Sequence, residues 1–427
     1  MRPISRETHT IAPHTIIAPH SIAPRSIAIR LSAFYGALFL VYGAHVPYFP
    51  VWLDGRALSP SDISYIVAAP FFLRLAVTPL LAVFADRHQA HRRMIVLLAW
   101  AALGLVLALS QMRGFWPVFL LAVPFAIAVT SIMPLTETLA VSRVRAEGLD
   151  YGRVRLWGSL TFVVMGLVGG ILVQHFGGSV GVWLLIFGAA LTVVAAHLLP
   201  GLNPVSAPSQ VPHPPLARGD VMALIGNPLF LIFLVSVGCT QASHATFYTF
   251  GALHWQALGI SSSSIGVMWA IAVLAEVALF AWSRQVIARF GPVELLIAGA
   301  LAAVVRWVIM SLDPPLGVLM PLQLLHALTY GATHLAAIHF IARAVPESAA
   351  GTAQALYASV AAGVIMGAAT LVSGPLFAAY GGGAYLAPAA ISLVGLAAAL
   401  VLAKRWDGGR IGARSPEIIP TTPVPGP

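Results

Sequence analysis

The sequence predicts an all-α membrane protein with twelve transmembrane helices arranged as two pseudosymmetric six-helix bundles. Of its 427 residues, 59% are hydrophobic and 9% are charged. Apolar stretches of roughly 20 residues recur between short polar turns, and a helix of that length crosses a hydrocarbon core ~30 Å thick. The stretches lack the period-two alternation of membrane β-strands. Helices, which satisfy their backbone groups within each span, are therefore expected.

The expected spans follow one another with short connections. They are 31–52, 63–85, 94–110, 115–141, 154–174, 182–198, 228–253, 265–283, 294–312, 318–341, 353–372 and 384–402. A proline-rich segment, residues 200–227, divides them six and six, so we expect bundles at 31–199 and 228–403 joined by a cytoplasmic linker. Residues 1–30 repeat an Ile-Ala-Pro unit whose prolines interrupt helices. We expect disordered tails at 1–30 and 404–427.

The basic residues are distributed unevenly over the expected loops. Of 23 lysines and arginines, only Arg56 and Arg113 fall in loops opposite the side that holds both termini. Positive loops stay inside, so both termini are expected in the cytoplasm, with the chain in a bacterial-type cytoplasmic (inner) membrane. The remaining positive charge suits anionic lipid headgroups. Nucleic-acid binding would need a soluble basic face that is missing.

Ionisable residues inside the apolar runs are the main functional signal. Glu137 and Glu276 lie deep in such runs, and so do Arg74, Arg155 and Arg306. Each costs on the order of 3 kcal/mol at bilayer depth on insertion scales, so these groups are expected to border a water-filled cavity or one another. A polar path between helices indicates transport.

Other functional classes find little support. Cys239 is the only cysteine, and the i, i+5 offset of His334 and His339 places them on different helix faces, so we expect no metal and no cofactor. The chain has neither a Walker lysine motif nor a hydrolase motif, so we expect no ATP-driven step and no enzyme. A transporter-like membrane sensor remains an alternative. We expect the chain to act as a monomer.

The loop after the second expected span carries a motif. Residues 82–87 read AVFADR and are followed by Arg92 and Arg93, which resembles the cytoplasmic loop motif of the major facilitator superfamily. In that superfamily the aspartate docks on a helix N-terminus across the bundle, an attraction that the helix dipole supplies. The resemblance implies that Asp86 and Arg87 form a gate. The alternative is a solvated turn.

A closer resemblance extends over nearly all the expected spans. The segments that carry it are 50–53, 134–137, 150–159, 241–255, 275–277, 305–307, 325–326 and 334–337. They resemble the 3-phenylpropionic acid transporters, which are relatives of lactose permease within the same superfamily. This resemblance implies proton-coupled uptake of a small solute by alternating access between the two halves.

The first half supplies one expected substrate contact. Glu137 and Arg155 lie on consecutive antiparallel spans and can pair, and the resemblance implies that such an acid and arginine bind ligand; the alternative is a structural ion pair. Arg155, Ser159 and Phe162 recur at i, i+4 and i+7, which places them on one helix face. We expect this face to contact the substrate.

Two further stripes mix aromatic and polar side chains at i, i+3 and i+7. An aromatic acid would find ring faces and hydrogen-bond donors in them, but they can equally serve as interhelical contacts. The first stripe is Tyr42, His45 and Phe49, and the second is Gln241, His244 and Tyr248.

Proton coupling is expected in the second half. Glu276 lies on the eighth span, with Arg306 and His326 on the next two. The proton affinity of a carboxyl group in a low-dielectric cavity can change as an arginine approaches or withdraws. Lactose permease has a further carboxylate one turn after the histidine, where this chain has Thr329. Glu276, His326 or Glu137 is therefore expected to carry the proton.

The balance of intramembrane charge favours an organic anion. Arg74, Arg155 and Arg306 outnumber the two carboxylates and leave a cation for a substrate carboxylate. Arg74 is the surplus charge, or else it bonds to carbonyls near Pro70. We therefore predict import of a small aromatic carboxylate such as 3-phenylpropionate, with Arg155 and Arg306 as anion contacts. A sugar, oligosaccharide or nucleoside symporter is the alternative.

Overall fold

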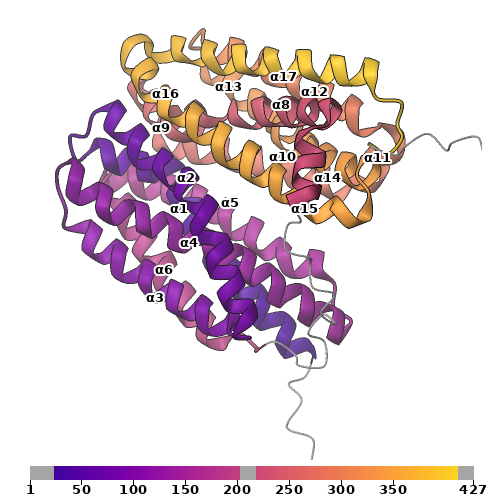
Figure 1. Cartoon of the computed structure of the whole chain (residues 1–427). Coiled ribbons are helices and arrows are strands. Elements are labelled where there is room, and N and C mark those ends of the chain that lie inside the picture. Colours follow the sequence, from indigo (N-terminus) through magenta and orange to yellow (C-terminus); the bar gives the residue numbers. More distant parts are fainter. Residues whose placement is uncertain (1–23, 202–217, 412–427) are drawn as a thin grey trace, which may run out of the picture.

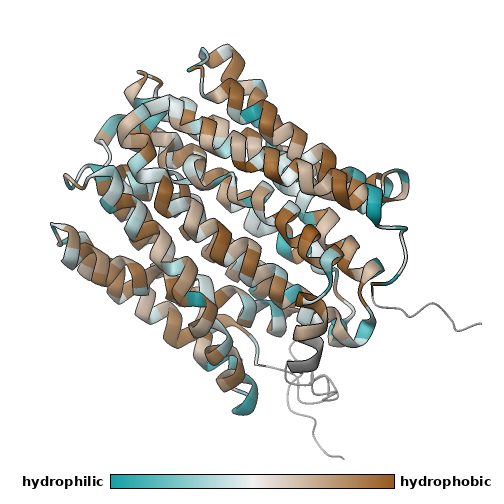
Figure 2. Cartoon of the chain, turned by 45° about the horizontal axis from the view of Figure 1, so that its top comes forward, coloured by the Kyte–Doolittle hydropathy of each residue, from teal (hydrophilic) through white to brown (hydrophobic). Residues whose placement is uncertain are grey.

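Helices make up every regular element of the described chain. The computed structural model describes residues 24–201 and 218–411. Figure 1 shows the helices that precede residue 201 gathered on one side and those that follow residue 218 on the other. Apolar residues dominate the lengths of the helices and hydrophilic residues lie mostly near their ends (Figure 2). The all-α fold class is confirmed.

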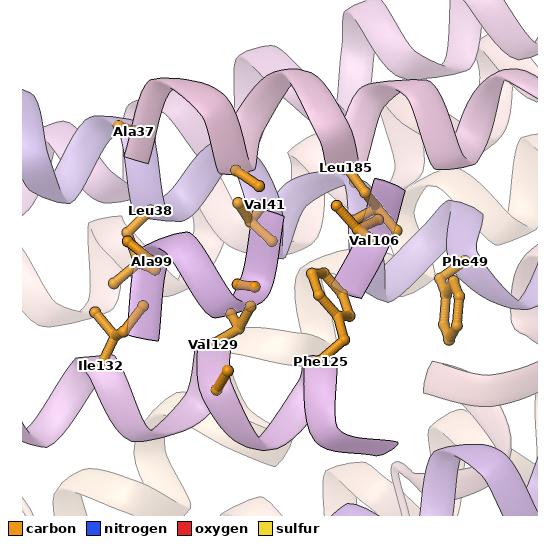
Figure 3. Packing of buried hydrophobic residues seen from close by; sticks show 14 of the residues in the cluster. Ala37, Leu38, Val41, Phe49, Ala99, Val106, Phe125, Val129, Ile132 and Leu185 are labelled. Carbon is orange, nitrogen blue, oxygen red and sulfur yellow. The ribbon is translucent and has the colours of Figure 1, made fainter. Parts of the chain in front are cut away.

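The first half consists of long helices packed around an apolar core. They are α1 (Pro24–Asp54), α2 (Pro60–Arg87), α3 (His91–Ser110), α4 (Phe115–Glu147), α5 (Tyr151–Phe176) and α6 (Val180–Leu198). The Ser59 side chain and Asp62 form a capping box that starts α2. Helix α1 packs against α5 and α6, and α3 packs against α4 and α6. Phe125 and Val129 of α4 and Leu185 of α6 belong to one buried apolar cluster, in which Leu185 lies beside Val106 of α3 (Figure 3).

The second half contains more interrupted helices. They are α7 (Arg218–Ile225), α8 (Pro228–Ala242), α9 (Ala245–Ala257), α10 (Ser262–Ala281), α11 (Ser283–Arg289), α12 (Pro292–Met310), α13 (Leu316–Leu322), η1 (Gln323–Leu325), η2 (Ala327–Ala332), α14 (Thr333–Ala344), α15 (Glu347–Ser359), η3 (Val360–Ile365), α16 (Met366–Tyr380), η4 (Gly381–Tyr385) and α17 (Leu386–Arg405). η1 and η4 are 3₁₀ turns, whereas η2 and η3 are π turns. Such turns interrupt the regular α-helical ladder inside two of the expected spans.

The number of spans differs from the prediction in an informative way. Within the described ranges, 10 helical stretches are long and apolar enough to cross a membrane, and one of them, Glu347–Arg405, is 59 residues long and holds the last two expected spans. The expected span at 318–341 is not among the 10, and 3₁₀ and π turns lie within it. The count of twelve therefore stays a prediction.

Helices extend past some of the expected boundaries. Helix α1 begins at Pro24 and buries Ile27, so residues 24–30 are helical; proline is tolerated in a first turn, whose N–H groups lack helical partners. Helix α7 lies in the expected linker. After α17 the chain is tied back, since the Ile411 N–H donates to the Ala344 carbonyl at 2.6 Å. The predicted disorder at 1–23 and 412–427 and the linker residues 202–217 lie outside the described residues.

The halves meet most extensively where α5 packs against α10 and α2 against α16, and α1 also packs against α9. Gly166 and Gly266 approach so closely that Gly266 has no room for a Cβ atom. Gln174 Oε1 accepts a hydrogen bond from the Ser262 N–H at 2.7 Å. These contacts lie toward the end of the molecule that carries the loops 55–59, 177–179 and 258–261. We call it the closed end.

Candidate substrate and proton site

A cavity of about 350 Å³ lies between the two halves. Helices α1, α4 and α5 line it from the first half, and α9, α10 and η2 line it from the second. Ligand pockets for small molecules typically measure ~300–1,000 Å³. The cavity therefore has the size of a small-molecule site and lies between the two halves.

One face of α5 forms part of the cavity wall. Arg155, Ser159 and Phe162 all line the cavity, as their helical spacing predicts. They add a cation, a hydroxyl group and an aromatic ring to one surface. The shared face is confirmed, and its contact with substrate stays a prediction.

Glu137 and Arg155 pair beside the cavity. Arg155 Nε lies 3.8 Å from Glu137 Oε1, and the Tyr151 hydroxyl donates a hydrogen bond to the Glu137 carboxylate. The Arg155 guanidinium also lies over two rings, with Cζ 4.1 Å from the centroid of Phe39 and 5.4 Å from that of Tyr35. Stacking on aromatic faces and pairing with a carboxylate both use the planar guanidinium. The geometry therefore requires arginine rather than lysine.

Arg155→Lys is expected to raise the substrate concentration for half-maximal uptake roughly tenfold, the equivalent of about 1.4 kcal/mol. A compact ammonium cannot lie flat on Phe39 while it pairs with Glu137. Uptake kinetics in proteoliposomes measure the change. Arg153→Lys is the matched control, because Arg153 lies two residues away with its side chain 88% exposed. Unchanged kinetics in Arg155→Lys would leave the pair with a purely structural role.

Glu276 faces the same cavity from α10 and approaches His326. Glu276 Oε2 lies 3.5 Å from His326 Nε2, and the other ring nitrogen, Nδ1, lies 3.2 Å from Arg306 Nη1. A guanidinium can only donate hydrogen bonds, so His326 Nδ1 must accept and the imidazole is neutral. Its proton is then on Nε2 and points toward Glu276. Glu276 and His326 both line the cavity, and the assignment of the proton to Glu276 stays a prediction.

Arg306 lies behind the cavity wall, which makes its predicted role as a direct anion contact wrong in this structure. Its side chain is 0% exposed and does not line the cavity. It donates to Gln323 Oε1 at 2.8 Å and to Thr329 Oγ1 at 3.3 Å. Its guanidinium also lies 4.7 Å from the ring centroids of Phe247 and Trp307. The Arg306 guanidinium is therefore surrounded by groups of the protein itself and does not contact the cavity.

The predicted stripe on the seventh span reaches the cavity through one of its three members. Only Tyr248 lines the cavity, whereas Gln241 and His244 are buried. His244 Nδ1 lies 3.0 Å from the Gln241 carbonyl, and Nε2 lies 2.9 Å from Thr329 Oγ1. The stripe keeps its face, since the His244 ring stacks on that of Tyr248 with ring centroids 5.4 Å apart. The physical reason is that η2 covers its first two members, because the Tyr330 carbonyl also accepts from Gln241 Nε2 at 3.5 Å.

A smaller pocket of about 180 Å³ adjoins the cavity. The stripe on α1, Tyr42, His45 and Phe49, lines this pocket, and Tyr42 and Tyr248 line both spaces. Arg74 of α2 also lines it. The stripe on α1 is therefore a pocket surface, as its spacing predicts.

Asp86 has a different partner from the one expected. Its carboxylate lies 2.9 Å from His91 Nε2 at the start of α3, and its side chain is 65% exposed. The predicted docking across the bundle is not made here, because the partner belongs to the same half. A gating role for Asp86 and the neighbouring Arg87 in another conformation stays a proposal.

Several site residues were missed by the reasoning from sequence. Tyr330 lines the cavity and stacks on His326 with ring centroids 5.4 Å apart, and its i, i+4 spacing from that histidine could have indicated it. Phe39 and Tyr35 of α1 pack against the guanidinium of Arg155 on α5. No pattern of neighbouring residues in the sequence indicates this contact between two helices. Within the described ranges, no group of three or more His, Cys, Asp and Glu side chains could hold a metal.

Two helical halves that enclose a charged cavity define a secondary transporter of the major facilitator type. The chain belongs to the MFS_1 like family, whose model matches residues 28–386. It is a multi-pass membrane protein that carries a small molecule, and its relatives and fold are those of transporters rather than enzymes.

Named relatives differ in what they carry. A probable 3-phenylpropionic acid transporter of Escherichia coli (strain K12) is 33% identical over 366 residues, which cover 85% of this chain and 94% of that protein. A maltose permease of Geobacillus stearothermophilus is 31% identical over 386 residues, covering 87% and 93%. The crystal structure of the nucleoside transporter NupG matches with a TM-score of 0.77 over 89% of this chain and 100% of that one. At 17% identity, this last match shows the fold alone.

Proposed function

We propose that the protein is a proton-coupled symporter that imports a small aromatic carboxylate such as 3-phenylpropionate by alternating access. It acts as a monomer in a bacterial-type inner membrane, with both termini in the cytoplasm. One observation carries the proposal: the cavity between the halves combines aromatic walls, a cation and a carboxyl group.

The cavity chemistry favours an aromatic acid. The cavity is lined by the rings of Phe162, Tyr248 and Trp269, whose faces can pack against a phenyl group. Contacts between aromatic rings are more favourable than the burial of their surface area alone. Arginine binds carboxylates with two parallel hydrogen bonds. The relative named as a probable 3-phenylpropionic acid transporter supports the same substrate class.

Glu276 is the proposed proton carrier, with Glu137 and His326 as supporting groups. An anion that enters the cavity makes the net charge of the cavity more negative. An unbalanced charge has a high free energy where the local dielectric constant is low. Protonation of Glu276 offsets that charge. The proton and the anion therefore bind more favourably together than separately, which is the physical requirement for symport.

A sugar or oligosaccharide symporter is the second candidate. The Glu137–Arg155 pair offers both acceptors and donors, which suits a ligand rich in hydroxyl groups. The maltose permease among the relatives supports this candidate as well.

Competition in proteoliposomes tests the substrate class. We expect labelled 3-phenylpropionate to accumulate when the outside is acidic, and accumulation to stop when a protonophore collapses the gradient. An excess of maltose or of a nucleoside is expected to leave uptake unchanged. Uptake of the disaccharide alone would overturn the assignment.

A further inference from the structure

Arg74 is a cation in the membrane-spanning part that has no carboxylate partner. In the described parts of the chain no acidic side chain pairs with it, in contrast to Arg155, which pairs with Glu137. Arg74 Nη2 donates to the Ala362 carbonyl of η3, and the guanidinium lies 4.7 Å from the ring centroid of Phe71. A guanidinium carries five N–H donors, so Arg74 retains donors beyond this bond.

The pocket that Arg74 lines holds a second unused polar group. Nε2 of His45 is buried and has no hydrogen-bond partner among the described residues. The imidazole stacks on Phe49 with ring centroids 4.8 Å apart, which fixes its plane beside the pocket. Buried polar atoms are rarely left unpaired, so an orphan nitrogen in a pocket points to a ligand group.

We propose that Arg74 and His45 hold the carboxylate of the transported anion in the 180 Å³ pocket, while its aromatic ring extends past Tyr248, which lines both spaces, into the 350 Å³ cavity beside Phe162 and Trp269. The inference rests on the proposed function for its substrate class. Arg74 supplies the positive charge, and His45 donates from Nε2. The other intramembrane arginines are less suited. Arg306 does not reach the cavity, and Arg155, although its Nη1 is buried without a hydrogen-bond partner, has its charge balanced by Glu137.

The position of Arg74 also places the site beside a contact between the two halves. Arg74 belongs to α2, whereas Ala362 belongs to η3, which lies 288 residues further along the chain in the other half. A carboxylate on the remaining donors lies beside this contact between the halves. The filled site and the contact therefore share one guanidinium.

Calorimetric titration of the purified full-length protein tests the site with two probes, 3-phenylpropionate and its uncharged amide. Arg74→Gln is expected to raise the Kd of the acid roughly 10- to 100-fold, because a hydrogen bond to a charged group is lost. The Kd of the amide should stay within about twofold, which also shows that the variant is folded. Arg74→Lys keeps the charge, so its loss should be smaller.

Arg113→Gln is the matched control, since Arg113 is exposed and carries the same charge. We expect it to leave both Kd values unchanged. Equal weakening of acid and amide in Arg74→Gln would overturn the site, because it would indicate a change of shape rather than of charge. A charge-selective loss in Arg155→Gln, with none in Arg74→Gln, would overturn it too.

Measuring both binding and transport distinguishes a failure of the proposed Arg74 site from a failure of the proposed symport function. If the unaltered protein binds 3-phenylpropionate in the Arg74-dependent manner but does not accumulate it, the symport proposal fails and the site stands. If the unaltered protein accumulates the acid and Arg74→Gln binds it normally, the site fails alone. If the unaltered protein binds no aromatic acid, both are wrong.

Discussion

Glu276→Gln should abolish proton-driven accumulation of substrate while leaving exchange of substrate across the membrane partly intact. Glutamine keeps the shape of the side chain and can still face His326, but it cannot take up or release a proton. Symport then loses the charge compensation that links proton and anion. In proteoliposomes with an acidic exterior, we expect the internal concentration of labelled substrate to reach, and not exceed, the external one.

Counterflow distinguishes loss of coupling from loss of folding. In vesicles preloaded with unlabelled substrate, Glu276→Gln should still exchange it for labelled substrate at a measurable rate. Glu294→Gln is the control, because Glu294 is an exposed residue in the first turn of α12. Normal accumulation by Glu276→Gln would move the coupling role to Glu137 or His326.

Gly266→Leu is expected to prevent the closed end from forming and so to stop the transport cycle. The carbonyl of Gly166 lies where a side chain on Gly266 would have to fit, and it belongs to the backbone of α5, which cannot move aside as a flexible side chain could. Overpacking costs about 1–3 kcal/mol. That cost lowers the population of the closed arrangement roughly 5- to 150-fold.

Cysteine labelling measures the closed end directly. Ser262→Cys, in a chain whose Cys239 is replaced by serine, places a thiol at a position that is 6% exposed beside the contact. Adding Gly266→Leu should accelerate its reaction with a membrane-impermeant maleimide and lower substrate uptake. Gly104→Leu is the control, because nothing lies within 4 Å of a Cβ at Gly104. Slow labelling together with normal uptake in Gly266→Leu would show that the two helices can separate enough to fit leucine.

Part of the site could be predicted from periodicity. Arg155, Ser159 and Phe162 share a face because α5 is a regular helix without an internal break. Glu137 and Arg155 pair because their helices are consecutive and antiparallel. The same reasoning failed for Gln241 and His244, since η2, a segment far along the chain, covers both side chains.

Hydropathy, charge placement and helical spacing are properties of neighbouring residues. They were therefore sufficient to predict the all-α membrane class, the ionisable groups inside the apolar runs, and the face of α5 that lines the cavity. Whether a buried cation meets the cavity or the protein interior depends on segments far away in the chain. Arg306 is enclosed by Gln323 and Thr329, whereas Arg74 meets Ala362 of the other half. Only the packing of the two halves decides between these outcomes, because the free energy of a buried charge depends on every group that surrounds it.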